Sequence, residues 1–308
     1  MTEYVEIVEV GARDGLQNEA RPVSTPEKLA LINRCIAAGA RRIEVASFVN
    51  PARVPQMADA EAVIAALPNR ADVRYIGLCL NKRGVLRALA SREAGARGVD
   101  EAGCVIVASD TFGQRNQGQT IAEGIRENSE MLRLAREGGL FPQVTITAAF
   151  GCPFEGHVPA ARVVELARRM AEAGAAEIAL GDTIGVGVPQ QVADLFGMVA
   201  EAAPGVALRA HFHNTRGTGI ANAWAAFQAG VRTLDSSLGG LGGCPFAPKA
   251  TGNIATEDLV YMLDRSGVET GLDLDALIAA NYWFEPIIGR PLPASLGRAG
   301  AWTGHIAA

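Results

Sequence analysis

The sequence has few cysteines, and none of them forms a recognisable pair. The 308 residues include five cysteines, which are widely spaced and never occur in a CxxC pattern. An odd, scattered set of this kind argues against both a disulfide framework and a thiolate metal site. The N-terminus also lacks the basic and apolar regions of a secretory signal, since it carries Glu3, Glu6 and Glu9. We therefore expect a reducing compartment and a cytoplasmic location.

Long apolar runs and an excess of basic residues are also absent. No apolar run reaches the roughly 18 residues that a membrane span requires, so we expect no membrane partner. The 28 Lys and Arg residues against 33 Asp and Glu give a net charge of −5, which argues against nucleic acid as a partner. Hydrophobic residues make up 49% of the chain, enough for a sizeable core, and this excludes a disordered or fibrous protein.

Short β-branched or apolar runs alternate with Ala- and Leu-rich stretches of helical periodicity, which is typical of βα units around a parallel sheet. The eight predicted strands are Tyr4–Val10, Arg42–Ser47, Val73–Leu80, Gly103–Ala108, Gln143–Ala149, Glu177–Leu180, Ala207–Phe212 and Thr233–Ser237. Pro159 and Pro189 indicate helix starts, and an Ala-Gly pair ends three helices, at Gly39, Gly174 and Gly230.

Eight βα units in about 265 residues match the size of a closed (β/α)8 barrel, the TIM barrel. The alternative, a doubly wound open sheet, lacks its GxGxxG signal after the first predicted strand. We predict one TIM-barrel catalytic domain over residues 1–285 and a short C-terminal extension over residues 286–308.

Functional side chains of a closed barrel gather where its strands end and the following loops begin. The polar residues that fall at such positions in this sequence are Arg13, Asp14, Glu44, Ser47, Asp182, His211 and His213. Burying so many ionisable groups is costly unless they are paired or bind a ligand, so we predict the active site at this end. Glu44 lies in an otherwise apolar strand, which favours a site residue over a paired core group. Asp182 fits a helix cap as well as it fits a catalytic role.

His211 and His213 alternate along one predicted strand and therefore point to the same face of the sheet. The chain has four histidines in all, so a chance pair at this spacing, the alternative interpretation, is uncommon. Two imidazoles, the carboxylate of Asp14 and an amide oxygen form a mixed set of ligands that suits Mg²⁺, Mn²⁺ or Zn²⁺ with positions left for substrate. This pattern predicts a metal centre.

A glycine-rich segment follows the last predicted strand and leads to Cys244. Four glycines in five residues, Gly239–Gly243 around one leucine, let the backbone move and approach a ligand closely. We predict that Cys244 acts as an acid in the active site, and the alternative is a buried, inert cysteine in a tight turn. The other four cysteines are expected to be packed residues.

Several longer motifs carry a resemblance to a known family. They are Glu9–Glu19, Ala46–Pro51 with Val54–Met57, Gly151–Gly156, Leu180–Gly187, Gly239–Pro245 and Gly252–Leu263. In this order they resemble the 3-hydroxy-3-methylglutaryl-CoA lyases, within the DRE-TIM metallolyase superfamily. The resemblance covers the chain from about residue 4 to about residue 290.

The resemblance implies a carbon–carbon lyase that cleaves a 3-hydroxy-3-methylglutaryl-CoA-like thioester, an acyl-CoA, by a retro-Claisen reaction. The products would be acetyl-CoA and a 3-oxo acid, acetoacetate, as in leucine degradation and ketone-body formation. The resemblance also implies a divalent metal, Mg²⁺ or Mn²⁺ with Zn²⁺ as an alternative, held by Asp14, His211, His213 and Asn253. For the assembly we expect a homodimer or a higher homo-oligomer.

The family's catalytic roles carry over to residues that match its motifs. Arg13 would stabilise the enolate oxygen, and Cys244 would transfer a proton to the acetyl carbanion. Glu44 and Asp182 match positions next to the metal and the substrate hydroxyl, where one proton acceptor is needed. The resemblance further implies that Gln17 and Ser47 contact the substrate.

One stretch departs from the family's pattern, which continues from its second metal histidine with Asp-Thr-Tyr-Gly-Gln. This chain has Asn214 and Arg216 where that pattern has Asp and Tyr. Since arginine pairs well with carboxylates, Arg216 is predicted to bind the substrate and to favour another branched 3-hydroxyacyl-CoA, such as citramalyl-CoA. Two further alternatives are a Claisen-condensing acyltransferase of the isopropylmalate synthase type and a non-catalytic metal or acyl-CoA binder.

Overall fold

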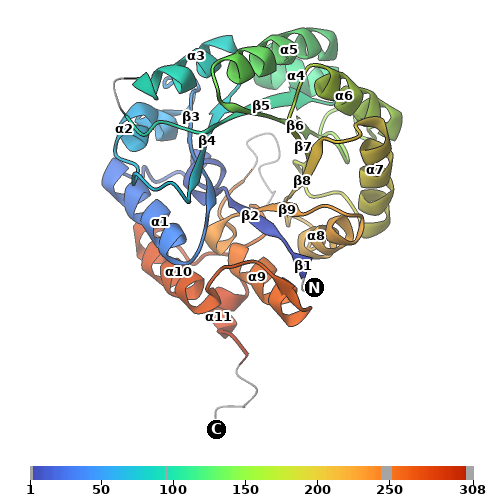
Figure 1. Cartoon of the computed structure of the whole chain (residues 1–308). Coiled ribbons are helices and arrows are strands. Elements are labelled where there is room, and N and C mark those ends of the chain that lie inside the picture. The colour runs from blue at the N-terminus through green and yellow to red at the C-terminus, as the bar shows by residue number, and fades with distance from the viewer. Residues whose placement is uncertain (1–2, 94–95, 244–251, 303–308) are drawn as a thin grey trace.

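The computed structural model describes residues 3–93, 96–243 and 252–302. Eight parallel strands close into a barrel in the order of the sequence, and helices surround the barrel on its outer side (Figure 1). The barrel strands are β2 (Glu6–Glu9), β3 (Arg42–Ser47), β4 (Arg74–Cys79), β5 (Glu101–Val107), β6 (Phe141–Thr147), β7 (Glu177–Asp182), β8 (Ala207–Phe212) and β9 (Thr233–Ser236). The predicted (β/α)8 TIM barrel is therefore confirmed.

Helices follow every strand of the barrel, and β5 is followed by two of them. The outer helices are α1 (Thr25–Ala37), α2 (Ala60–Ala65), α3 (Lys82–Ala90), α4 (Asp110–Gln117), α5 (Ile121–Glu137), α6 (Ala160–Glu172), α7 (Pro189–Ala202), α8 (Gly219–Gln228) and α9 (Thr256–Arg265). Short helical turns occupy Gly11–Gly15, Pro55–Met57 and Leu238–Gly240. In the described part of the chain, every helix is too short or too polar to cross a bilayer.

Helix boundaries follow the signals in the sequence. Pro159 is the N-cap of α6, and Pro189 is the first residue of α7. The predicted Ala-Gly stops are also present, because Gly39, Gly174 and Gly230 adopt φ values of 104°, 92° and 98°, which favour glycine. These turns bring each helix back to the start of the next strand.

The first predicted strand, Tyr4–Val10, is wrong as a single element. It divides at Val5, whose N–H donates to the carbonyl of Glu269, while the N–H of Glu6 donates to the carbonyl of Arg232. Strand β1 (Glu3–Tyr4) therefore pairs with β10 (Val268–Glu269) outside the barrel, and only β2 joins the barrel. The change of partner depends on a segment more than 260 residues away in sequence, which local periodicity does not contain.

The C-terminal part of the described chain packs against the barrel. Helix α10 (Leu274–Ile288) lies next to α1 and α9, and the short helix α11 (Leu296–Ala299) follows it (Figure 1). The predicted division between residues 285 and 286 falls inside α10, with Pro286 in the helix, and it remains a prediction about domain organisation. Cys35, Cys79, Cys104 and Cys152 are free and buried, as expected of packed residues.

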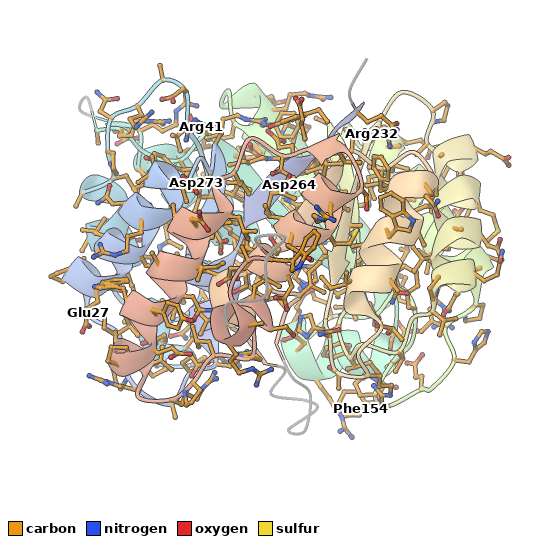
Figure 2. The ribbon with its side chains drawn as sticks, turned by 90° about the horizontal axis from the view of Figure 1, so that it is seen from below. Glu27, Arg41, Phe154, Arg232, Asp264 and Asp273 are labelled. Carbon is orange, nitrogen blue, oxygen red and sulfur yellow. The ribbon has the colours of Figure 1, made fainter. Side chains whose placement is uncertain are left out.

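The amino-terminal and carboxyl-terminal ends of the barrel strands lie at opposite edges of the molecule. In the view from below, Arg41 and Arg232, which precede strands, lie toward one edge, and Phe154, in the loop after β6, lies toward the opposite edge (Figure 2). The first edge is the amino-terminal end of the strands and the second is the carboxyl-terminal end.

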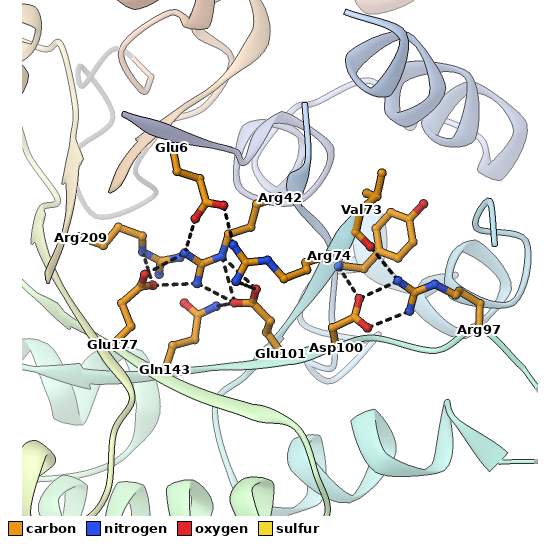
Figure 3. Close-up of polar contacts among 11 residues, drawn as sticks. Glu6, Arg42, Val73, Arg74, Arg97, Asp100, Glu101, Gln143, Glu177 and Arg209 are labelled. Carbon is orange, nitrogen blue, oxygen red and sulfur yellow. Dashed lines mark hydrogen bonds and ion pairs between the residues drawn. The ribbon is translucent and has the colours of Figure 1, made fainter. Parts of the chain in front are cut away.

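Near the amino-terminal end, the barrel interior is filled by a buried ionic cluster (Figure 3). Arg42 is 1% exposed, and its Nη2 lies 2.6 Å from Glu101 Oε2 while its Nη1 lies 2.7 Å from Glu177 Oε2. Gln143 donates a further hydrogen bond to Glu101, and Glu6 pairs with Arg42 from the rim. Burial raises the pKa of Glu101, although the charge of Arg42 opposes that shift. Each charge here therefore depends on partners from other strands.

Candidate active site

A cavity of about 160 Å³ opens at the carboxyl-terminal end of the barrel strands. It is lined by Arg13, Asp14, Gln17, Asn18, Glu44, Leu78, Leu80, Val105, Phe112, Asn116, Thr145, Thr147, Thr183, Arg209, His211, His213, Asp235 and Gly243. Most of the predicted site residues are among them, so the structure brings the N-terminal motif and the histidine pair together.

Three candidate metal ligands converge in this cavity. Ligand atoms of Asp14, His211 and His213 all lie within 4.8 Å of one another. The two imidazoles project from the end of β8 to the same side, with ring centres 5.2 Å apart. Phe212, between them, is buried against Phe150 instead, as strand alternation requires.

Asn253 completes the predicted set of four ligands. It pairs with His213 in an isolated β-bridge, and its Nδ2 donates to Asp14 Oδ2 at 2.8 Å and to the carbonyl of Leu241 at 3.1 Å. Within the described residues, the buried Oδ1 of Asn253 and Nδ1 of His213 have no hydrogen-bond partner. An amide oxygen and an imidazole nitrogen left without partners beside a carboxylate fit a divalent cation.

For Asp14 and His213, the electrostatics of the site favour the protonation states that bind metal. Burial alone would raise the pKa of Asp14, but the charges of Arg13, His211 and His213 outweigh it and hold that pKa below its usual value. Burial lowers the pKa of His213 to about 4, and neighbouring His211 adds to the shift. Asp14 is therefore ionised and His213 neutral near pH 7, which is the form of each that coordinates a metal.

Arg13 is one of two arginines that line the cavity. It lies in the turn Gly11–Gly15 after β2, and its guanidinium is 2.7 Å from Asp14 Oδ1 and 2.6 Å from Glu44 Oε2. Burial raises the pKa of Glu44, while the neighbouring charge of Arg13 opposes the shift. A fixed cation facing a cavity can stabilise an oxyanion, and a carboxylate of raised pKa can accept a proton.

Asp182 and Ser47 lie at the ends of their strands but not in the lining of this cavity. The two carboxylate oxygens of Asp182 accept hydrogen bonds from the backbone N–H groups of Val186 at 2.9 Å and Gly187 at 2.8 Å. It therefore orders the loop between β7 and α7. Ser47 is fully buried, and its Oγ has no partner within the described residues.

Gln17 and Arg216, both predicted to contact the substrate, occupy different places. Gln17 lines the cavity, and its Oε1 has no partner among the described residues. Arg216 is exposed at the rim and does not line the cavity, and its Nη1 donates to the carbonyls of Ile184 at 2.8 Å and Gly185 at 2.9 Å. Asn214 accepts a hydrogen bond from the N–H of Gly219 at the start of α8.

The glycine-rich segment is anchored below the cavity by two buried carboxylates. Glu9 accepts a hydrogen bond from the N–H of Leu238, and Glu257 accepts one from the N–H of Gly239. Burial raises the pKa of Glu9 to about 7 and that of Glu257 to about 8. The segment is described as far as Gly243, so Cys244 lies outside the described residues and its predicted role stays a prediction.

Sequence reasoning missed Arg209 and Asp235, which both line the cavity. Asp235 Oδ2 lies 3.1 Å from Nδ1 of His211. The signal that identified Glu44, a charged residue in an otherwise apolar strand, could also have identified Arg209 and Asp235. Arg209 also precedes His211 by two positions, which places both on the same face of β8.

Comparison with known proteins identifies the family of this chain. A family model described as HMGL-like matches residues 4–282. The chain belongs to the HMGL-like family. The resemblance to 3-hydroxy-3-methylglutaryl-CoA lyases is thus confirmed over nearly the whole barrel.

Two relatives and one solved structure similar to this HMGL-like chain are lyases. An (R)-citramalyl-CoA lyase of Chloroflexus aurantiacus is 46% identical and covers 97% of this chain and 95% of the relative. A hydroxymethylglutaryl-CoA lyase of Pseudomonas mevalonii is 44% identical over 89% of each chain. A solved HMG-CoA lyase of Acinetobacter baumannii, in complex with coenzyme A and 3-methylmalate, superposes with a TM-score of 0.93 at 38% identity, covering 99% of this chain and 98% of that one. The HMGL-like chain is accordingly a carbon–carbon lyase, as expected.

Proposed function

We propose that this lyase cleaves a 3-hydroxy-3-methylglutaryl-CoA-like thioester into acetyl-CoA and acetoacetate in a metal-dependent retro-Claisen reaction. The observation that carries the proposal is the cluster of Asp14, His211, His213 and Asn253, with its unpartnered donor atoms, beside Arg13. When bound there, Mg²⁺ or Mn²⁺, with Zn²⁺ as the alternative, would lower the pKa of the substrate's tertiary hydroxyl.

Of the two predicted acceptors of the hydroxyl proton, Glu44 is the better placed, since it lines the cavity and Asp182 does not. As the proton leaves, the carbinol carbon becomes a ketone and its bond to the α-carbon of the thioester breaks. The electron pair of that bond passes to the acetyl thioester as an enolate. Arg13 faces the cavity and would stabilise the enolate oxygen. The α-carbon then takes up a proton, for which Cys244 is the proposed donor.

A second candidate substrate is (R)-citramalyl-CoA, which the same steps would split into acetyl-CoA and pyruvate. The observation in its favour is the 46% identity to a lyase named for that substrate, over 97% of this chain. The two thioesters differ by one methylene between the tertiary carbon and the carboxylate. Such a difference is worth roughly 10- to 200-fold in discrimination in a pocket that contacts it.

The test is to incubate the metal-depleted protein with each thioester, with and without Mn²⁺, and to identify products by mass spectrometry. Acetyl-CoA with acetoacetate, formed only with metal, would support the first substrate, and acetyl-CoA with pyruvate would support the second. Asp14→Asn serves as the inactive control. Condensation of acetyl-CoA with a 2-oxo acid, without cleavage of either thioester, would instead support the acyltransferase alternative.

Arg216 remains a proposed determinant of this choice. We expect Arg216→Tyr to change the ratio of kcat/KM for the two thioesters by about tenfold, because it removes a cation at the mouth that can pair with a carboxylate. Equal ratios for the parent and the variant, measured on the same metal-loaded preparations, would contradict a role in selection.

The cytoplasmic location and the homo-oligomer also stay predictions, and light scattering would measure the oligomeric state.

A further inference from the structure

The buried charges of the barrel form one connected path from the amino-terminal cluster to the candidate metal ligands. Arg209 links the two parts by ion pairs rather than hydrogen bonds: its Nε lies 3.4 Å from Glu177 Oε1 and 3.5 Å from Asp235 Oδ1. Asp235 Oδ2 in turn lies 3.1 Å from His211 Nδ1. Figure 3 shows Arg209 and Glu177 meeting beside Arg42. Arg209 and Asp235 are each 5% exposed, so solvent contributes little to balancing their charges.

Strand register explains why these side chains meet. Strand β8 pairs with β9 so that Arg209 is opposite Thr233 and Ala210 is opposite Leu234. Continuing this register places Asp235 next to His211. Arg209 and His211 point to the same side of β8, about 6.6 Å apart along the strand at 3.3 Å per residue. Asp235 therefore reaches His211 with one oxygen and Arg209 with the other.

The hydrogen bond from His211 defines which of its nitrogens is free. An ionised carboxylate only accepts, so Nδ1 carries the proton, and in the neutral imidazole Nε2 keeps its lone pair. Nε2 lies 3.9 Å from Asp14 Oδ2, on the side where the candidate ligands converge. In metal sites, a carboxylate of this kind orients the ligating imidazole, and its loss commonly weakens metal binding by about 10- to 100-fold.

We propose that Arg209 is a positioning residue for the metal centre, which it serves by holding Asp235 in the orientation that fixes His211. The inference rests on the metal site of the proposed function. In the described chain, the ion-pair partners of Asp235 are Arg209 and His211. Without Arg209, the carboxylate loses its guanidinium ion-pair partner and is free to turn away from the imidazole.

If charge attraction alone determined metal affinity, removing Arg209 would strengthen metal binding rather than weaken it. The connected ion pairs contain four guanidinium groups and six carboxylates, which leaves two negative charges when every carboxylate is ionised and His211 is neutral. A divalent cation would balance them. Removing the positive charge of Arg209 would then strengthen the attraction for a cation. Weaker metal binding after removal of Arg209 would therefore indicate positioning, and stronger binding would indicate an effect of charge alone.

The experiment measures Mn²⁺ binding to the metal-depleted full chain by titration calorimetry, without substrate. We expect Arg209→Met to weaken Mn²⁺ binding about tenfold, and Arg209→Lys, which keeps the cation, to restore most of it. Asp235→Asn should weaken binding as well, and adding Arg209→Met to Asp235→Asn should have little further effect, because Arg209 acts through Asp235. Arg74→Met is the matched control, since it removes a cation of the same path that contacts Glu6 and Glu101 but not Asp235.

Unchanged or tighter Mn²⁺ binding by Arg209→Met would overturn the proposal, and so would equal effects of Arg209→Met in the parent and Asp235→Asn backgrounds. Circular dichroism in EDTA shows whether each variant folds, and Arg209→Gln replaces Arg209→Met if the latter does not. A parent chain that fails to bind Mn²⁺ would refute this inference together with the metal site. Tight Mn²⁺ binding without cleavage of any thioester would refute only the proposed reaction.

Discussion

Single residues of this site are defined by the partners that they lack as much as by those they have. His213 Nδ1 and Asn253 Oδ1 are buried acceptors without a partner in the described chain, whereas both oxygens of Asp182 are engaged by backbone N–H groups. The sequence identified His213 and Asp182 by their place at strand ends, and the family resemblance implied Asn253. It could not separate them, because the engagement of Asp182 depends on how the following loop closes.

Arg13 gives a direct test at this scale. We expect Arg13→Met to lower kcat by about 10²- to 10³-fold, because the developing enolate would lose its fixed cation. KM for the thioester should change much less, since the interaction grows as the bond breaks. Steady-state kinetics with saturating Mn²⁺ would measure both. Arg74→Met, at the opposite end of the barrel, is the control, and a kcat within threefold of the parent for Arg13→Met would contradict the assigned role.

At the scale of elements, the sequence predicted the position of a strand or helix where the residues that fix its ends are close to it in sequence. The helix stops at Gly39, Gly174 and Gly230 are examples, because each turn is completed by the next strand. The division of the first predicted strand at Val5 was not predictable, since it depends on pairing with Val268–Glu269. The position of Asp235 next to His211 was hidden for a similar reason, because it arises from the register of β8 against β9.

The glycine-rich segment gives a prediction for one element. Gly242 has φ of +131°, and a Cβ placed there would lie 2.8 Å from Nδ2 of Asn253 and 3.3 Å from its backbone nitrogen. We expect Gly242→Ala to displace Asn253, and so to weaken Mn²⁺ binding and lower kcat by at least tenfold. Gly243→Ala is the matched control, because a Cβ there meets no described atom within 4 Å. Equal Mn²⁺ affinities of the two variants would contradict this account.

At the scale of the whole molecule, the barrel combines an apolar core between strands and helices with buried charge inside the strands. The alternation of the sequence was sufficient to predict eight βα units and the end of the barrel that carries the site. It did not predict that Arg42, Glu101 and Glu177 fill the opposite end, because each of them is stabilised only by strands that are distant in sequence. Local hydrophobic periodicity contains no information about such pairing.

Stability should depend on pH through the carboxylates that anchor the glycine-rich segment. Burial raises the pKa of Glu257 from 4.5 to about 8, so the folded protein binds this proton more tightly than the unfolded chain does. The resulting stabilisation is complete below about pH 4.5 and is lost as the pH rises toward 8. In the parent chain, we expect this group to lower the free energy of unfolding by about 2–4 kcal/mol between pH 5 and pH 8. Glu257→Gln should lack this decrease.

Urea denaturation of the metal-free protein at several pH values would measure this difference. The parent chain is compared with Glu257→Gln, so that titration of groups distant from Glu257 contributes equally to both curves. Glu269→Gln is the control, because Glu269 is an exposed glutamate outside the barrel. Parallel pH dependences of the parent and Glu257→Gln would show that Glu257 does not hold its proton in the folded state.

The ionic cluster of Arg42, Glu101 and Glu177 also constrains how the sequence can drift. Exchanging one member leaves a buried charge alone, at a cost of about 3–5 kcal/mol, whereas replacing all members by well-packed apolar residues is often neutral. Single changes are therefore removed by selection, and the positions should vary as a linked set among homologues. A mutagenesis library that randomises one of these positions at a time should return mainly the parent residue, and one that randomises all three together should also recover uncharged solutions.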